Sequence, residues 1–142
     1  LVTGTIQEKL NRVRCHFIFF HRAFEADNIF LIDLNCFENL VASHLLKWVH
    51  FEQDTKGREL ELRYFRDIDG REVDFVVVEG RRPLLLAECK WADAPLDRGV
   101  RYLKARFPHT EAWQISATGT KDYQSPEGVR VAPALRLLER LI

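Results

Sequence analysis

Between positions 59 and 91 the apolar residues fall into three short runs that are rich in Val, Leu and aromatic side chains. Short runs of this composition, separated by segments that contain Gly and Pro, are typical of β-strands joined by turns. They predict strands at 59–66, 71–79 and 83–91. The segment that joins the last two runs contains Gly80, so the simplest arrangement of these two strands is a hairpin.

Two other stretches carry apolar residues at the spacing of an amphipathic helix. At 36–51, Val41, Leu45 and Val49 lie on one arc, opposite a polar arc. The second helix is predicted at 97–107, where apolar and basic residues alternate with a helical period.

The rest of the chain completes the order of elements. Strands are predicted at 111–117 and 129–132, separated by a loose loop at 118–128, and Pro133 is a good first residue for a final helix. A helix, three strands, a helix, two strands and a helix predict an α/β fold.

The first 35 residues are harder to connect with this pattern. They predict a weak helix at 5–13 and short strands at 16–20 and 29–33, and we interpret 1–35 as an N-terminal segment left from an upstream module. The main domain is predicted at 36–142. Because the chain begins with Leu and contains no Met, we expect it to be a piece of a longer protein.

The predicted hairpin carries the charged residues that indicate chemistry. It sets Asp74 beside Glu88, and because side chains alternate along a strand, Glu88 and Lys90 point to one side and Cys89 to the other. Two carboxylates in a small volume repel each other unless a cation lies between them. Hard oxygen ligands suit Mg²⁺ or Mn²⁺ better than zinc.

Glu38 is a third candidate, because it falls within the apolar arc of the predicted 36–51 helix. A carboxylate in that position needs an ion pair, a hydrogen bond or a metal. The alternative is that Glu38 is a first-turn acid favoured by the helix dipole, with Asn35 as the N-cap.

Four short motifs follow one another on these elements. In chain order they are Phe37-Glu38-Asn39-Leu40-Val41, Tyr64-Phe65-Arg66, Glu72-Val73-Asp74-Phe75 and Glu88-Cys89-Lys90. With them the chain resembles the PD-(D/E)XK, or restriction-endonuclease-like, nuclease superfamily over residues 37–142. It is most similar to the uncharacterised C-terminal domain of prokaryotic AAA-type ATPases. Val73 stands where the superfamily name has Pro, and the chain contains no G-x-x-x-x-G-K-[ST] motif of an ATPase.

The resemblance implies a restriction-endonuclease-like core, a mixed central β-sheet flanked by helices, and metal-dependent hydrolysis of phosphodiester bonds. It implies that Asp74 and Glu88 bind Mg²⁺ or Mn²⁺ together with the Cys89 carbonyl, and that Glu38 joins directly or through water. Lys90 would orient the attacking water or stabilise the charge that develops on the phosphate. The implied catalytic set is Lys90, Glu88, Asp74 and Glu38. The implied partners are nucleic acid, with DNA as the first expectation, and an ATPase module in cis or in trans. No association with a membrane is expected.

Composition narrows the class of protein. With 142 residues, 46% of them hydrophobic, the chain can bury a core without disulfides. Cys15, Cys36 and Cys89 are odd in number and lack metal-ligand spacing, so we expect a reducing, cytoplasmic compartment. No apolar run approaches the length of a membrane span.

Charge is the observation that least suits a nuclease. The net charge is zero, whereas nucleic-acid binders are often basic. The local clusters of Lys and Arg are more typical of a solvated surface than of a phosphate groove. Arg66 and Arg71, which flank the turn before the Asp74 strand, are the cations to test first for contact with phosphate.

The remaining polar and aromatic candidates are weaker. Gln114 is more often a polar side chain on a half-buried sheet than a positioning residue, and Tyr64, Trp91 and Trp113 suit the core better than base stacking. The histidines are scattered along the chain, and we do not expect them to take part in catalysis. A rival hypothesis remains, in which the domain is non-catalytic and serves protein or nucleic-acid interaction, with the acids and Lys90 forming a buried ion-pair network.

Overall fold

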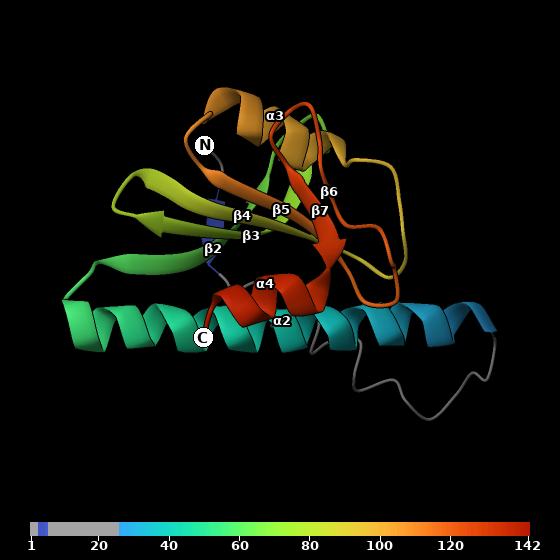
Figure 1. Cartoon of the computed structure of the whole chain (residues 1–142), viewed down its shortest axis with the longest axis horizontal. Coiled ribbons are helices and arrows are strands. Elements are labelled where there is room, and N and C mark those ends of the chain that lie inside the picture. Colours follow the sequence, from blue (N-terminus) through green and yellow to red (C-terminus); the bar gives the residue numbers. More distant parts are fainter. Residues whose placement is uncertain (1–2, 6–25) are drawn as a thin grey trace.

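The computed structural model describes residues 3–5 and 26–142 of the chain. Within these residues one seven-stranded sheet is flanked by three helices (Figure 1). The helices are α2 (Ala26–Lys56), α3 (Arg98–Arg106) and α4 (Ala134–Arg140). The strands are β1 (Thr3–Thr5), β2 (Leu60–Arg66), β3 (Glu72–Glu79), β4 (Arg82–Lys90), β5 (Glu111–Ser116), β6 (Tyr123–Gln124) and β7 (Arg130–Pro133). The α/β class predicted from the sequence is confirmed.

The sheet is mixed, with the strand order β1-β2-β3-β4-β5-β7-β6. The strands β1 to β4 are antiparallel neighbours, whereas β4, β5 and β7 run parallel to one another. Antiparallel neighbours can be joined by short turns, but a parallel neighbour needs a crossover. The helix α3 provides the crossover between β4 and β5, and therefore begins close to the end of β4.

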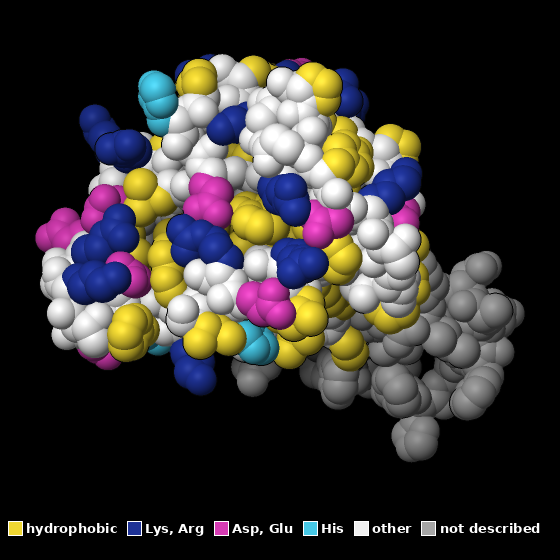
Figure 2. Space-filling model, in the orientation of Figure 1, with side chains coloured by type: hydrophobic (Ala, Val, Ile, Leu, Met, Phe, Trp, Pro, Cys, Tyr) yellow, Lys and Arg dark blue, Asp and Glu magenta, His cyan; other side chains and the backbone are white. Residues whose placement is uncertain are grey.

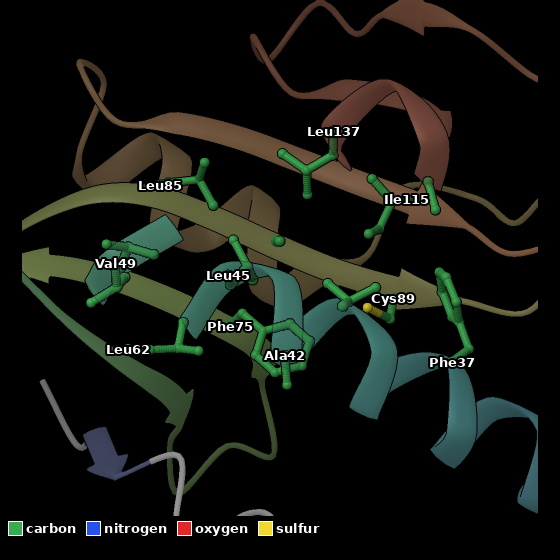
Figure 3. Close-up of a cluster of buried hydrophobic side chains, with 14 of the residues drawn as sticks. Phe37, Ala42, Leu45, Val49, Leu62, Phe75, Leu85, Cys89, Ile115 and Leu137 are labelled. Atoms are coloured by element: carbon green, nitrogen blue, oxygen red, sulfur yellow. The ribbon is translucent and has the colours of Figure 1, made fainter. Parts of the chain in front are cut away.

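Two apolar clusters hold the layers together, one on each face of the sheet. On one face, residues of α2 and α4 pack against Phe75, Cys89 and Ile115 (Figure 3). On the other face, Val100 and Leu103 of α3 pack against residues of β2, β3 and β4. Figure 1 shows α3 on one side of the sheet and α2 with α4 on the other.

Most of the predicted elements agree with the structure. The strands predicted at 59–66, 71–79 and 83–91 are β2, β3 and β4, each within about one residue at its ends. The helix predicted at 97–107 and the strand predicted at 111–117 are confirmed as α3 and β5. The strand predicted at 129–132 is β7, and the final helix is α4, with Pro133 as its N-cap.

The strand predicted at 29–33 is wrong, because these residues belong to α2. The helix runs without Gly or Pro to Lys56 and ends at Gly57, whose φ of 63° lies in the left-handed region that glycine adopts readily. A continuous apolar run does not distinguish a strand from part of a helix by its periodicity. Asn35 consequently lies inside the helix and is not an N-cap.

Other predictions for the N-terminal part are untested. The strand predicted at 16–20 and nearly all of the helix predicted at 5–13 lie outside the described residues. The division into a segment 1–35 and a domain 36–142 stays a prediction. Among the described residues, no helix is both long and apolar enough to cross a membrane.

Candidate functional site

The β3–β4 hairpin brings the two predicted carboxylates together. Backbone pairing between these strands ends at Phe75 and Ala87, one step before Asp74 and Glu88. Beyond it, the backbone N–H of Cys89 donates to Oδ2 of Asp74 over 2.8 Å, and the backbone N–H of Asp74 donates to Oε2 of Glu88 over 3.2 Å. Each carboxylate therefore binds a backbone donor of the facing strand. The prediction that the hairpin sets Asp74 beside Glu88 is confirmed.

A β-bulge in β3 places Asp74. Phe65 pairs with Val73, and the next pair is Arg63 with Val76, so β3 has Asp74 and Phe75 where β2 has one residue. A bulge redirects the side chains next to it. Its effect is visible in the core, where Val73 packs on the α3 side and Phe75 packs on the α2 side, although strict alternation would place them on the same side.

Lys90 is held by two carboxylates. Its Nζ donates to Oε1 of Glu88 over 2.8 Å and to Oδ2 of Asp97 over 2.9 Å. Asp97 is the N-cap of α3, and its Oδ1 accepts a hydrogen bond from the N–H of Gly99 over 2.7 Å. We did not identify Asp97 as a site residue from the sequence. The available signal was an Asp at the start of a helical pattern, soon after the Glu-x-Lys motif.

Gln114 contributes more than the sequence suggests. Its side chain is almost fully buried, at 2% exposure. Its Oε1 accepts the N–H of Asp97 over 2.7 Å, and its Nε2 donates to the carbonyls of Ala94 and Pro95. Gln114 therefore fixes the segment that leads from β4 into α3.

Part of this group borders a cavity of about 560 Å³, whose lining includes neither Asp97 nor Gln114. Asp74 and Glu88 line it from the hairpin, and Lys90 lies beside them. Glu38 lines the same cavity from α2, well inside the helix, where the dipole of the helix end no longer acts. The first-turn explanation of Glu38 is thus excluded. Glu72 and Asp93 add two further carboxylates to the lining.

Burial and repulsion shape the ionisation of this group. Asp74 is 7% exposed and Glu88 is 6% exposed. Burial, and then the negative charge of Asp74, raise the pKa of Glu88 to about 8, although Lys90 acts in the opposite direction. Burial by itself lowers the pKa of Lys90, but Glu88 and Asp97 outweigh it and hold this pKa above its ordinary value.

The donor set suits a small hard cation. The two oxygens of Glu88 each accept one hydrogen bond, and a carboxylate oxygen has two lone pairs, so each of them can take a further ligand. Mg²⁺ is commonly bound by one or two carboxylates and completed by water and substrate phosphate. Within the described residues, no group of three or more His, Cys, Asp or Glu side chains is placed to hold a metal ion. Glu38 thus lines the cavity without completing a three-carboxylate group.

The other predicted candidates lie apart from this site or serve the fold. Tyr64 is buried, the indole N–H of Trp113 donates to Glu111, and Trp91 lines the cavity while packing against the core. No histidine of the described chain lines the cavity. Cys36 and Cys89 are free thiols.

The raised pKa of Glu88 predicts how stability changes with pH in the absence of divalent ions. The folded state binds a proton at Glu88 up to about pH 8, whereas the unfolded chain releases it near the ordinary value of 4.5. This group therefore lowers the free energy of unfolding as the pH rises from 4.5 to about 8. Urea unfolding should show that Glu88→Gln loses less stability than wild type across this range.

The matched control for this measurement is Glu79→Gln, at the other end of β3. Arg58 holds the pKa of Glu79 below its ordinary value, so Glu79 is already ionised throughout this range. The Glu79→Gln protein should therefore keep the wild-type pH dependence. Equal pH dependence in Glu88→Gln and wild type would contradict the assignment.

Comparison with known proteins adds a family. No curated protein and no solved structure is similar enough to the chain to be a match. Residues 35–137 match the model of one family, which is described as Domain of unknown function (DUF4143). The matched region includes the hairpin, Glu38 and the crossover helix α3. The chain belongs to the DUF4143 family.

Proposed function

We propose that this domain hydrolyses phosphodiester bonds in nucleic acid with the help of Mg²⁺ or Mn²⁺. One observation carries the proposal: two adjacent buried carboxylates and a lysine ammonium lie together at the wall of one cavity. Burying two carboxylates side by side costs free energy unless a cation or a proton compensates for their repulsion. A site with strongly perturbed ionisation in a cavity is where catalysis is expected.

Asp74 and Glu88 would hold the metal, together with the backbone carbonyl of Cys89. Glu38, across the cavity, would contribute through a water molecule. A divalent ion bound there supplies a Lewis acid for the phosphate and lowers the pKa of a bound water. The hydrogen bonds from the Cys89 and Asp74 amides keep both carboxylates oriented before any ion arrives.

Lys90 would stabilise charge on the phosphate rather than bind the metal. Its ammonium is a compact positive charge beside the carboxylate pair, and it is held at the edge of the cavity by Glu88 and Asp97. A fixed positive charge at this position stabilises the negative charge that develops on the phosphate during attack. The neighbouring acids keep Lys90 protonated at every physiological pH, so its role is electrostatic.

The proposal places this domain with the PD-(D/E)XK nucleases. The mixed sheet, the α3 crossover after the Glu-x-Lys strand and the helix that carries Glu38 are compatible with a restriction-endonuclease-like core. DNA is the first substrate to test. An ATPase module, in cis or in trans, is the partner that the resemblance suggests.

The described cations differ in their freedom to bind phosphate. Arg71 bonds to Asp67 and Asp69 and stacks over Tyr102, so it is committed to the fold. Arg98 donates to backbone carbonyls of the β2–β3 turn. Most of the other arginines face acids, and Figure 2 shows Lys and Arg interspersed with Asp and Glu over one face of the molecule.

Arg66 is the cation best placed for substrate. It is exposed, and it pairs across the strands with Glu72, which lines the cavity. No acid among the described residues forms an ion pair with it. Of the two arginines that the sequence offered as the first to test, we therefore retain Arg66 for this role.

A second function has an observation in its favour. The ions Glu88, Lys90 and Asp97 already form a connected network without a metal, and no buried side-chain N or O atom of the described residues lacks a hydrogen-bond partner. A network that is complete in this way suits a non-catalytic domain for protein or nucleic-acid interaction. The experiments below separate the two functions.

Asp74→Asn should abolish cleavage and weaken Mg²⁺ binding by at least about 10-fold, because a charged ligand is replaced by a neutral one of the same shape. The Asn carbonyl can still accept the Cys89 N–H, so the protein should fold. Calorimetric titration with Mg²⁺ and Mn²⁺, beside cleavage assays on single-stranded, duplex and branched DNA, measures both effects. The control is Glu72→Gln, a cavity-lining acid of the same strand, which should retain activity. Unchanged metal affinity in Asp74→Asn would refute the ligand assignment.

Lys90→Ala distinguishes the two functions. In the nuclease, Mg²⁺ affinity should not fall while turnover falls by about 10²-fold or more, because an ammonium is not a ligand but stabilises the transition state. Without metal, the variant should melt lower than wild type, since Glu88 loses its cation. Saturating Mg²⁺ should restore most of this difference. If the variant melts lower and Mg²⁺ changes nothing in either protein, the domain is an interaction module.

Arg66→Gln should weaken DNA binding, whereas Arg81→Gln, at the opposite end of β3 in the turn before β4, should not. The loss of one phosphate contact should lower the slope of log affinity against log salt concentration by about one. Fluorescence anisotropy in the Lys90→Ala background, where cleavage is slow, measures this slope. Equal salt dependence in the two variants would remove Arg66 from the substrate surface.

A further inference from the structure

The two carboxylate oxygens of Asp97 accept hydrogen bonds from two different donors, a backbone amide and an ammonium. Its Oδ1 caps α3 by accepting the N–H of Gly99, and its Oδ2 accepts Nζ of Lys90. Capping needs only one acceptor oxygen, which Ser, Thr or Asn supplies equally well. The second oxygen, directed at an ammonium, is what requires a carboxylate.

Asp97 is itself held in place from β5. Its backbone N–H donates to Oε1 of Gln114, which is 2% exposed, and the amide of Gln114 donates to the carbonyls of Ala94 and Pro95. Gln114 lies in the register of the sheet directly beside Glu88. A buried amide whose two ends both bind the 94–97 segment sets the position of Asp97 relative to the carboxylate pair.

Lys90 needs such an anchor if the proposed function is correct. Its side chain is long and flexible, and an oriented charge contributes to catalysis only when its position is fixed. Glu88 shares its oxygens between Lys90 and the proposed metal, and a divalent cation repels a neighbouring ammonium. Asp97 is a separate partner of Lys90, does not line the cavity, and takes no part in the proposed metal site.

We propose that Asp97 is a positioning residue for Lys90 and that Gln114 holds Asp97 in place. Asp97 keeps the ammonium of Lys90 at the cavity when Glu88 binds the metal. This inference rests on the proposed nuclease function and names a residue that the motif does not contain. Asp97 does not touch the reacting atoms. It acts through Lys90.

The kinetic test uses Asp97→Asn, which keeps the shape and the helix cap but presents no negative charge to Lys90. The kcat should fall by about 10-fold or more, while KM and Mg²⁺ affinity stay within about twofold of wild type. In a Lys90→Ala background the same substitution should cost nothing further, because the residue through which it acts is gone. The control is Asp93→Asn, which should keep the wild-type kcat. Asp93 lines the cavity, but its carboxylate accepts hydrogen bonds from the backbone amides of Thr120 and Lys121 and none from Lys90.

Additive losses in the Asp97→Asn and Lys90→Ala double variant would overturn the proposal, and so would a weakened Mg²⁺ affinity in Asp97→Asn. A fall in thermal stability with normal kcat would also overturn it, because Asp97 would then be only a cap. Restoration of the cap by Asp97→Ser, without restoration of kcat, would support it.

A second measurement does not depend on activity. In protein labelled with ¹³C at lysine Cε, NMR relaxation should report a more mobile Lys90 side chain in Asp97→Asn than in wild type, and an unchanged one in Asp93→Asn. If wild type cleaves no nucleic acid, the proposed function fails, and this measurement alone decides the positioning role. Unchanged Lys90 mobility in Asp97→Asn would overturn the proposal.

Discussion

Two carboxyl groups lie side by side at the end of the β3–β4 hairpin, where burial leaves little water to screen them. Asp74 and Glu88 are both buried, and each accepts a hydrogen bond from the backbone of the other strand. Those bonds replace the ladder of backbone pairs that ends at Phe75 and Ala87. The repulsion between the carboxylates is the constraint to which the rest of the site responds, since a charged pair in this position must share a proton, bind a cation or unfold.

The surrounding structure answers that constraint in several ways. The bulge in β3 brings Asp74 to the amide of Cys89, and Lys90 supplies a cation from the same strand as Glu88. The crossover helix begins at this point and contributes Asp97, which gives Lys90 a second partner. Gln114 connects β5 to the same segment. Residues of β3, β4, β5 and the start of α3 are therefore joined by hydrogen bonds beside one cavity.

The same geometry permits a nuclease or a purely structural network, and the difference lies in Glu88. In a structural network, the charge of Glu88 is compensated permanently, either by a bound proton or by the ammonium of Lys90. In a nuclease, the repulsion that raises the pKa of Glu88 would be relieved by a bound divalent cation, which compensates for two carboxylates better than a proton or an ammonium does. Glu38, which lines the same cavity from α2, adds to the negative potential that would attract such an ion.

The sequence by itself determined the elements that rest on local chemistry. The β-branched runs and the Gly-containing turn specified the hairpin, and the helical period specified α3, because these signals come from residues near one another in the chain. The strand alternation also placed Glu88 and Lys90 on one side of β4. The motif order identified Asp74, Glu88, Lys90 and Glu38, and the structure places all four at one cavity.

Tertiary structure decided what no local pattern contains. The bulge depends on how β3 pairs with β2, the length of α2 depends on packing over a continuous apolar run, and the network of Asp97 and Gln114 exists only because the crossover returns α3 and β5 to the end of β4. A lone Asp before a helix and a lone Gln in a strand have ordinary explanations until their partners are known. Those partners lie seven and seventeen residues away, at hydrogen-bonding distance. Such contacts are set by the register of the sheet, which depends on many residues at once.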